Sequence, residues 1–200
     1  MAEIVVFHHA LGLTPGVRAF AEGLGRAGHR VHVPDLYEGR LFGALEEGVA
    51  HAQEIGIGAF IERGTAAAES AASAPVCVGF SLGVLPAQKY AQTAPGVRGA
   101  VLLEACVPRS EFGPAWPSGV PVQVHGMDAD PFFAGEGDLE AAMALAEESP
   151  DAEVFLYPGD RHLFTDSGLA SYDPTAAEQV RKRVLAFLAR IDAAPDATPS

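Results

Sequence analysis

Three residues have side chains suited to nucleophilic catalysis: Ser81, Asp130 and His162. Serine is a poor nucleophile at neutral pH, so a histidine must accept its proton as it attacks. A carboxylate then holds the imidazole in the useful tautomer and stabilises its cation. Each of the three residues is expected just past the end of a strand, in the chain order serine, acid, histidine. The sequence therefore predicts a catalytic triad.

The serine lies in Gly79-Phe-Ser-Leu-Gly83, after a β-branched run at 76–78 and before a helix-like segment at 84–92. This G-x-S-x-G pattern between strand and helix is typical of a nucleophile elbow. Glycines have no Cβ, so strand and helix can pack closely while the serine hydroxyl projects from a strained turn. A flexible turn is the alternative interpretation of so short a pattern, but the flanking strand and helix favour the elbow.

An acyl-transfer site also needs donors for the oxyanion. We expect the backbone amide of Leu82, at the start of the helix, and a second amide from the loop after the first strand, that of Ala10. Two aspartates compete for the role of triad acid. We favour Asp130, because Asp130-Pro-Phe-Phe133 resembles a turn fixed against apolar residues, whereas Asp128 would cap or solvate the turn.

Other polar and aromatic side chains near the predicted strand ends or in nearby loops are candidate substrate contacts. A metal held by His8, His9, Asp128 and Asp130 lacks any fixed-spacing motif, so we expect no metal and no cofactor. The candidate substrate contacts are His9, Tyr37, Glu104, Trp116 and Phe132.

These residues require a scaffold in which strands and helices alternate. We expect strands at 3–7, 29–34, 76–78, 97–105, 120–124 and 152–157, and helices from Pro15 to Gly28, at 59–73, 84–92 and 139–148, and from Asp173-Pro174 to 191. A short helix is expected within the connection 40–58. This order predicts an α/β fold with a mainly parallel central sheet flanked by helices on both faces, whose functional groups gather at the carboxyl ends of the strands.

Length and composition favour one domain. The chain has 200 residues, 48% of them hydrophobic and 20% charged, which suits a single core. We expect one domain over 1–191 and a flexible polar tail over 192–200.

The charge balance bears on the partners. The net charge is −13, and the one basic cluster is Arg181-Lys-Arg183, so we expect no nucleic acid and no membrane among the partners. Cys77 and Cys106 are interpreted as core residues of a reducing compartment. The N-terminus has neither a signal peptide nor a transmembrane pattern, so a cytoplasmic location is expected. For the oligomeric state, the sequence allows either a monomer or a homodimer.

Four motifs, at 34–39, 79–83, 130–133 and 157–162, occur in the order seen in the dienelactone hydrolase family, which the chain resembles over nearly its whole length. The resemblance implies an α/β-hydrolase fold without a large lid domain. It also implies a triad on Ser81, Asp130 and His162, and an oxyanion contribution near Ala10 and Leu82.

The chain departs from that family in three ways. The enzymes that define the family use cysteine as nucleophile, and they have a glutamate where this chain has His9. The arginines that grip the dienelactone carboxylate have no counterpart. The resemblance therefore supports hydrolysis of a carboxylic ester or lactone more than of dienelactone. A thioesterase or acyltransferase on the same triad, or a catalytically silent binding protein, are the alternatives.

Overall fold

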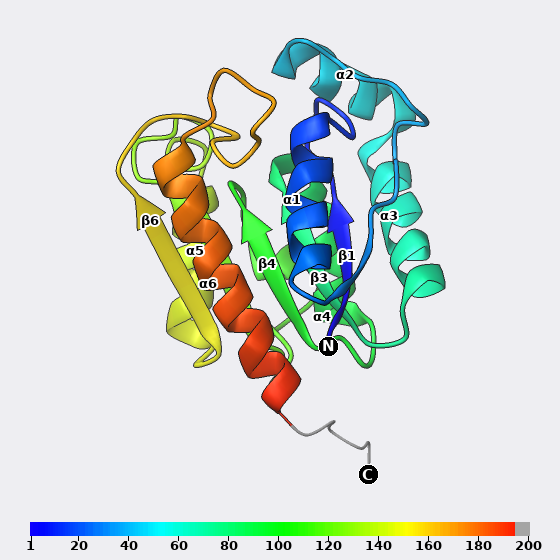
Figure 1. Cartoon of the computed structure of the whole chain (residues 1–200), viewed down its shortest axis with the longest axis vertical. Helices are drawn as coiled ribbons and strands as arrows, with labels where there is room; N and C mark the ends of the chain where they lie inside the picture. The colour runs from blue at the N-terminus through cyan, green and yellow to red at the C-terminus, as the bar shows by residue number, and fades with distance from the viewer. Residues whose placement is uncertain (195–200) are drawn as a thin grey trace.

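The computed structural model describes residues 1–194, which contain one central sheet. Its six strands are numbered in chain order, and each runs parallel to its neighbours. Their spatial order across the sheet is β2-β1-β3-β4-β5-β6. The predicted parallel α/β architecture is confirmed (Figure 1). The strands are β1 Glu3–Phe7, β2 Arg30–His32, β3 Pro75–Phe80, β4 Gly99–Leu103, β5 Val122–Met127 and β6 Ala152–Tyr157.

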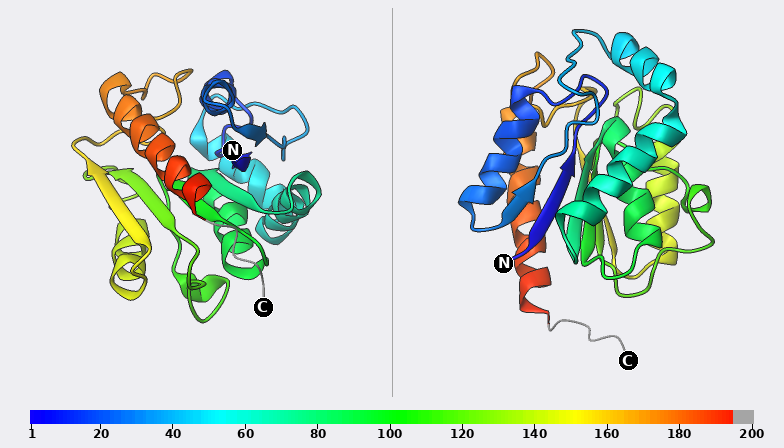
Figure 2. Two further views of the ribbon diagram at one scale, coloured as in Figure 1. Left: turned by 60° about the horizontal axis from the view of Figure 1, so that its bottom comes forward. Right: turned by 90° about the vertical axis from the view of Figure 1, so that its right-hand side faces the viewer.

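Helices cover both faces of the sheet. They are α1 Pro15–Arg26, α2 Leu45–Ile55, α3 Ile57–Ala71, α4 Val84–Thr93, α5 Asp138–Glu148 and α6 Pro174–Ala193. Helices α1 and α6 lie on one face and α3, α4 and α5 on the other, as the right-hand view of Figure 2 shows. Each face has its own cluster of buried apolar side chains. Helix α2 and the loop after β6 lie at the carboxyl ends of the strands (Figure 1).

The starts of α1 and α6 follow from their first residues. The Thr14 hydroxyl accepts a hydrogen bond from Val17 N at 3.2 Å. The Asp173 carboxylate accepts from Thr175 N and Ala176 N at 3.0 and 2.9 Å. In both helices a proline, which needs no amide partner, occupies the first turn. The sequence predicts both starts correctly for this reason.

Several element boundaries differ from the sequence prediction. Strand β2 is shorter than expected and pairs with β1 only over Arg30–His32. Strand β5 continues through His125 to Met127, because residues 125–127 pair in register with β6. Helix α6 includes Asp192, which the sequence analysis placed in the tail. The Asp192 carboxylate lies 2.8 Å from the Met1 amino group, which favours an ordered position for it. Ala193 also lies in α6, and residues 195–200 of the predicted tail lie outside the described residues.

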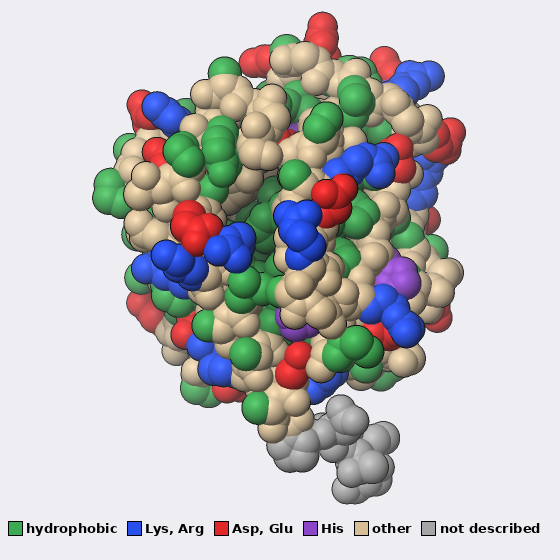
Figure 3. Space-filling view, viewed as in Figure 1, with side chains coloured by type: hydrophobic (Ala, Val, Ile, Leu, Met, Phe, Trp, Pro, Cys, Tyr) green, Lys and Arg blue, Asp and Glu red, His purple; other side chains and the backbone are tan. Residues whose placement is uncertain are grey.

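The surface charges and the two cysteines agree with the sequence prediction. On the face shown in Figure 3, Lys and Arg side chains are interspersed with Asp and Glu. Within residues 1–194 no helix combines the length and hydropathy needed to cross a bilayer. Cys77 and Cys106 are both free and buried, and burial raises the pKa of each thiol to about 12. Neither thiol is therefore an available nucleophile at neutral pH.

Candidate active site

The turn after β3 holds Ser81 in an unusual backbone conformation. Its φ is +45°, in the left-handed region that L-residues rarely adopt. A Cβ on Gly79 would lie 2.5 Å from Gly83 O, and one on Gly83 would lie 2.5 Å from Phe7 O. Both positions therefore require glycine, because β3, α4 and the end of β1 approach one another there. The close packing forces Ser81 to the outside of the turn.

Ser81, His162 and Asp130 form a continuous chain of contacts. Ser81 Oγ lies 2.8 Å from His162 Nε2, and His162 Nδ1 lies 2.7 Å from Asp130 Oδ2. An ionised carboxylate only accepts hydrogen bonds, so Nδ1 is the donor and the lone pair of Nε2 faces the serine. Asp130 is fully buried and its other oxygen accepts from Phe132 N at 2.9 Å. This arrangement can remove the serine proton.

The charges around His162 favour its cation. Burial by itself disfavours the imidazolium, but the hydrogen bond to Asp130 and the negative charges of Glu104, Asp130 and Asp138 outweigh it. The pKa of His162 is therefore raised above its ordinary value. This raised pKa makes His162 a stronger base than a free histidine. Burial also raises the pKa of the neighbouring Asp138 to about 6.

Asp128 has another partner. Its Oδ1 accepts a hydrogen bond from Gly159 N at 3.0 Å, and its side chain is exposed. It thus joins the ends of β5 and β6, as expected of a residue that caps a turn. Of the two aspartates that the sequence left in competition, Asp130 is the one that contacts the histidine.

The two predicted oxyanion residues lie on segments that touch each other. Ala10 is buried in the loop after β1, and a Cβ on Gly48 of α2 would lie 1.9 Å from its carbonyl oxygen. Leu82 directly follows the serine. A Cβ on Gly83 would lie within 2.6 Å of His8 O, so the elbow packs against the loop that contains Ala10.

His9 contacts protein groups rather than open space. It is fully buried; its Nε2 lies 2.7 Å from Asp166 Oδ2, and its Nδ1 accepts from Leu11 N at 3.2 Å. Thr14 Oγ1 donates to the same oxygen of Asp166. Both ring nitrogens are occupied, so the polar atoms of His9 join the loops after β1 and β6.

The other four candidate substrate contacts divide into two groups. Tyr37 and Trp116 are buried, with Tyr37 Oη donating to Gly48 O and Trp116 Nε1 to Val120 O. These two aromatic rings therefore belong to the core. Phe132 is 39% exposed, and its ring centroid lies 4.8 Å from that of His162. It is the candidate best placed to contact a bound molecule.

Glu104 is also buried, and it accepts two hydrogen bonds from Thr165. Sequence reasoning missed Thr165 and Asp166, which both bind the loop after β6 to neighbouring segments of the site. No local pattern points to Asp166, because its partners His9 and Thr14 lie 157 and 152 residues away in the chain.

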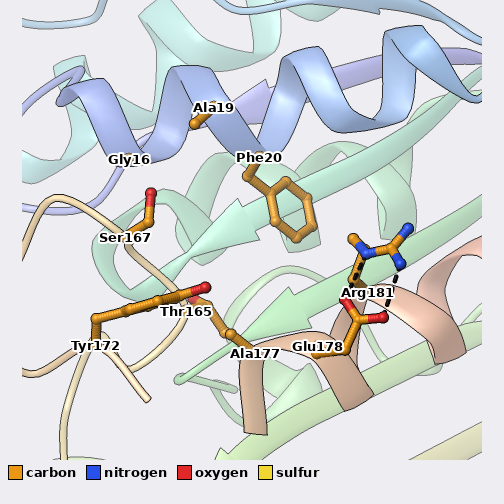
Figure 4. Close-up of a pocket in the computed structure, with 9 residues that line it drawn as sticks. All are labelled: Gly16, Ala19, Phe20, Thr165, Ser167, Tyr172, Ala177, Glu178 and Arg181. Atoms are coloured by element: carbon orange, nitrogen blue, oxygen red, sulfur yellow. Dashed lines mark hydrogen bonds and ion pairs between the residues drawn. The ribbon is translucent and has the colours of Figure 1, made fainter. Parts of the chain in front are cut away.

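Two hollows lie apart from Ser81. One, of about 140 Å³, lies between α1, α6 and the loop after β6 (Figure 4). It is lined by Phe20, Thr165, Tyr172 and the ion pair of Glu178 with Arg181, among others. The other, of about 610 Å³, lies between α3 and α4. Within the described chain, no three His, Cys, Asp or Glu side chains are grouped as a metal site.

Known structures share this fold. One is a candidate dienelactone hydrolase from Klebsiella pneumoniae, with 20% identity and a TM-score of 0.71 over 95% of this chain and 87% of the other. A dienelactone hydrolase-like promiscuous phosphotriesterase from metagenomic libraries has 18% identity and a TM-score of 0.75, over 96% and 87%. Est1E from Butyrivibrio proteoclasticus, solved with ferulic acid bound, has 16% identity and a TM-score of 0.67, over 97% and 90%.

A comparison with curated proteins finds no match. The sequence model of one family matches nearly the whole chain. That model is described as the dienelactone hydrolase family, and it covers residues 1–192. The chain therefore belongs to the dienelactone hydrolase family of α/β hydrolases.

Proposed function

We propose that this protein is a serine hydrolase that cleaves a carboxylic ester or lactone through an acyl-enzyme on Ser81. The observation that carries the proposal is the chain of contacts from Ser81 Oγ to His162 Nε2 at 2.8 Å and from His162 Nδ1 to Asp130 Oδ2 at 2.7 Å. Membership of a hydrolase family supports it.

Acylation begins when Ser81 Oγ attacks the carbonyl carbon of the substrate. His162 Nε2 takes the serine proton, and Asp130 stabilises the imidazolium that results. The amides of Leu82 and Ala10 are proposed to bind the oxyanion of the tetrahedral intermediate. When the intermediate collapses, the bond from carbon to the alcohol oxygen breaks, and His162 returns its proton to that oxygen.

Deacylation uses the same groups in reverse. A water molecule gives a proton to His162 Nε2 and attacks the acyl carbon. The second tetrahedral intermediate releases the carboxylic acid, and Ser81 recovers its proton from His162. With a lactone, the alcohol freed in the first step is part of the acyl group, and deacylation releases both together as a hydroxy acid. The cycle balances without a cofactor.

The proposed ligand is a small-molecule ester or lactone. Phe132 is half exposed beside His162, so it would pack against an apolar part of the substrate. The absence of nucleic acid and membrane partners, the cytoplasmic location and the choice between monomer and homodimer remain predictions of the sequence.

Labelling with a fluorophosphonate tests this proposal, followed by peptide mapping and by turnover of p-nitrophenyl acetate. We expect an adduct on Ser81 in the wild-type protein, and none in Ser81→Ala. His162→Ala should label at least 100-fold more slowly, since the serine then lacks its base (about 10²–10⁴ for a general base).

Circular dichroism must show that both variants are folded. Folded wild-type protein that neither labels nor turns over ester would contradict the proposal and favour the silent binding protein. Release of the acyl group to an added alcohol or thiol faster than to water would favour the acyltransferase.

A further inference from the structure

Glu104 is a buried carboxylate that the proposed cycle does not use. It directly follows β4, and the register of β3 with β4 pairs Phe80 with Leu103. The next residue on each strand is therefore Ser81 on one side and Glu104 on the other. Both have positive φ, +45° and +64°. The carboxyl end of the sheet thus holds Glu104 beside the nucleophile in a similarly strained conformation.

The side chain of Glu104 contacts the loop that carries the histidine. Its Oε1 accepts from Thr165 N at 3.0 Å and from Thr165 Oγ1 at 2.7 Å. Thr165 is three residues beyond His162. The carboxylate therefore fixes the position of this loop relative to the sheet.

The other oxygen of Glu104 has no partner in the described part of the chain. Oε2 is buried without a hydrogen bond, and the residue is only 1% exposed. A buried carboxylate with an unsatisfied oxygen is costly. Glutamine would accept the same two hydrogen bonds from Thr165 without a charge, so anchoring the loop does not by itself require glutamate.

The charged groups around Glu104 include the imidazole of His162, with which the carboxylate interacts electrostatically. Burial raises its pKa overall; the charge of a protonated His162, the hydrogen bonds from Thr165 and the charge of a protonated His9 oppose this rise without cancelling it. Around His162 the facing groups are Asp130 from the loop after β5, Glu104 from the end of β4, and Asp138 from the start of α5. Glu104 and His162 thus favour each other's charged form.

We propose that Glu104 is a positioning residue with two roles: it anchors the His162 loop through Thr165, and its negative charge stabilises the imidazolium that forms during acylation. This inference rests on the proposed function, in which His162 is the base. It adds a second carboxylate to the one that hydrogen-bonds the ring.

NMR titration of the His162 ring in the resting protein tests the second role without any turnover. In Glu104→Gln we expect the pKa of His162 to fall by about 0.5–1, since an opposite charge nearby is lost. The acid limb of kcat/KM should move to lower pH, and kcat should fall about 3- to 10-fold with little change in KM. A purely structural role would leave the titration of His162 as in the wild type.

Asp166→Asn is the matched control, because it removes a second buried carboxylate, one that lies on the His162 loop itself and contacts His9 and Thr14. It should leave the pKa of His162 unchanged. Should Glu104→Gln fail to fold, His162→Ala gives the reciprocal measurement: the pKa of Glu104, read from its side-chain carboxyl carbon, must rise. An unchanged pKa of His162 or Glu104 in the respective variant would overturn the proposal, even in an active esterase.

Discussion

Asp130 and Asp128 differ in what their carboxylates contact, although a single residue separates them. Asp130 is buried against His162, whereas Asp128 is exposed and accepts from Gly159 N. Burial that desolvates a carboxylate also strengthens its interaction with a nearby cation. The residue type is the same at both positions, so burial and hydrogen-bond partners distinguish the carboxylate that contacts His162 from the one that does not.

The pH dependence of activity follows from the charges around His162. As a base it must be neutral, and its pKa lies above the ordinary value of 6.5. Activity of the wild type should therefore rise with pH through an apparent pKa above about 6.5. Asp130→Asn should move that limb to lower pH and reduce kcat by about 10³–10⁴-fold, because the useful tautomer is lost. Profiles of kcat/KM against pH for both proteins measure this.

Asp128→Asn is the control for this experiment, since asparagine keeps the oxygen that accepts from Gly159 N. Its profile should match that of the wild type. A large shift in the Asp128 variant with a normal profile in the Asp130 variant would reverse the assignment of the acid.

At the scale of elements, the elbow depends on the close approach of β3, α4 and the end of β1. Gly83 has a negative φ of −65°, so its conformation suits any residue, and space alone excludes a side chain. A Cβ there would meet two backbone oxygens, of Phe7 and His8, at 2.5 and 2.6 Å. Backbone atoms cannot rotate away as a side chain can.

Gly83→Ala should therefore lower the free energy of unfolding by about 1–3 kcal/mol, as overpacking does elsewhere. It should also reduce kcat, because the elbow and the loop holding Ala10 must move apart. Urea denaturation and ester turnover measure the two effects. Gly25→Ala in α1 is the matched control: a Cβ there meets nothing within 4 Å, and alanine favours a helix, so stability should stay equal or rise. Equal stability of the two variants would contradict the packing argument.

At the scale of the whole molecule, a buried network joins the loop after β1 to the loop after β6. Asp166 in the loop after β6 contacts His9 and Thr14, which lie between β1 and α1. Burial of Asp166 opposes its ionisation, but hydrogen bonds from His9, Thr14 and Gly168 N outweigh it, and its pKa is lowered. The network holds α1 and the loop after β6 together beside the triad.

This network predicts how stability depends on pH. A carboxylate whose pKa is lower in the folded state stabilises the fold above its unfolded pKa, near 3.8, and this contribution disappears as the pH falls through the folded pKa. Asp166→Asn should lower the free energy of unfolding by about 1–3 kcal/mol at pH 7. Denaturation at pH 7 and near pH 3 should show the difference from the wild type shrinking in acid. A constant difference at both pH values would contradict this assignment.

The sequence by itself determined the elements, their order and the residues of the candidate site. Local signals suffice for much of this, because Thr14-Pro15 and Asp173-Pro174 each join a capping side chain to a first-turn proline, and the run at 76–78 followed by G-x-S-x-G specifies a strand, a tight turn and a helix. The parallel sheet then follows from their alternation, and strand ends bring Ser81, Asp130 and His162 to one edge.

Only the tertiary structure decided which side chains meet at that edge. His9, predicted to contact substrate, lies buried against Asp166, and Glu104 lies against Thr165. These contacts join residues 157 and 61 positions apart in the chain. Burial and hydrogen bonding across such separations depend on how the loops pack, for which a single sequence contains no periodic or local signal.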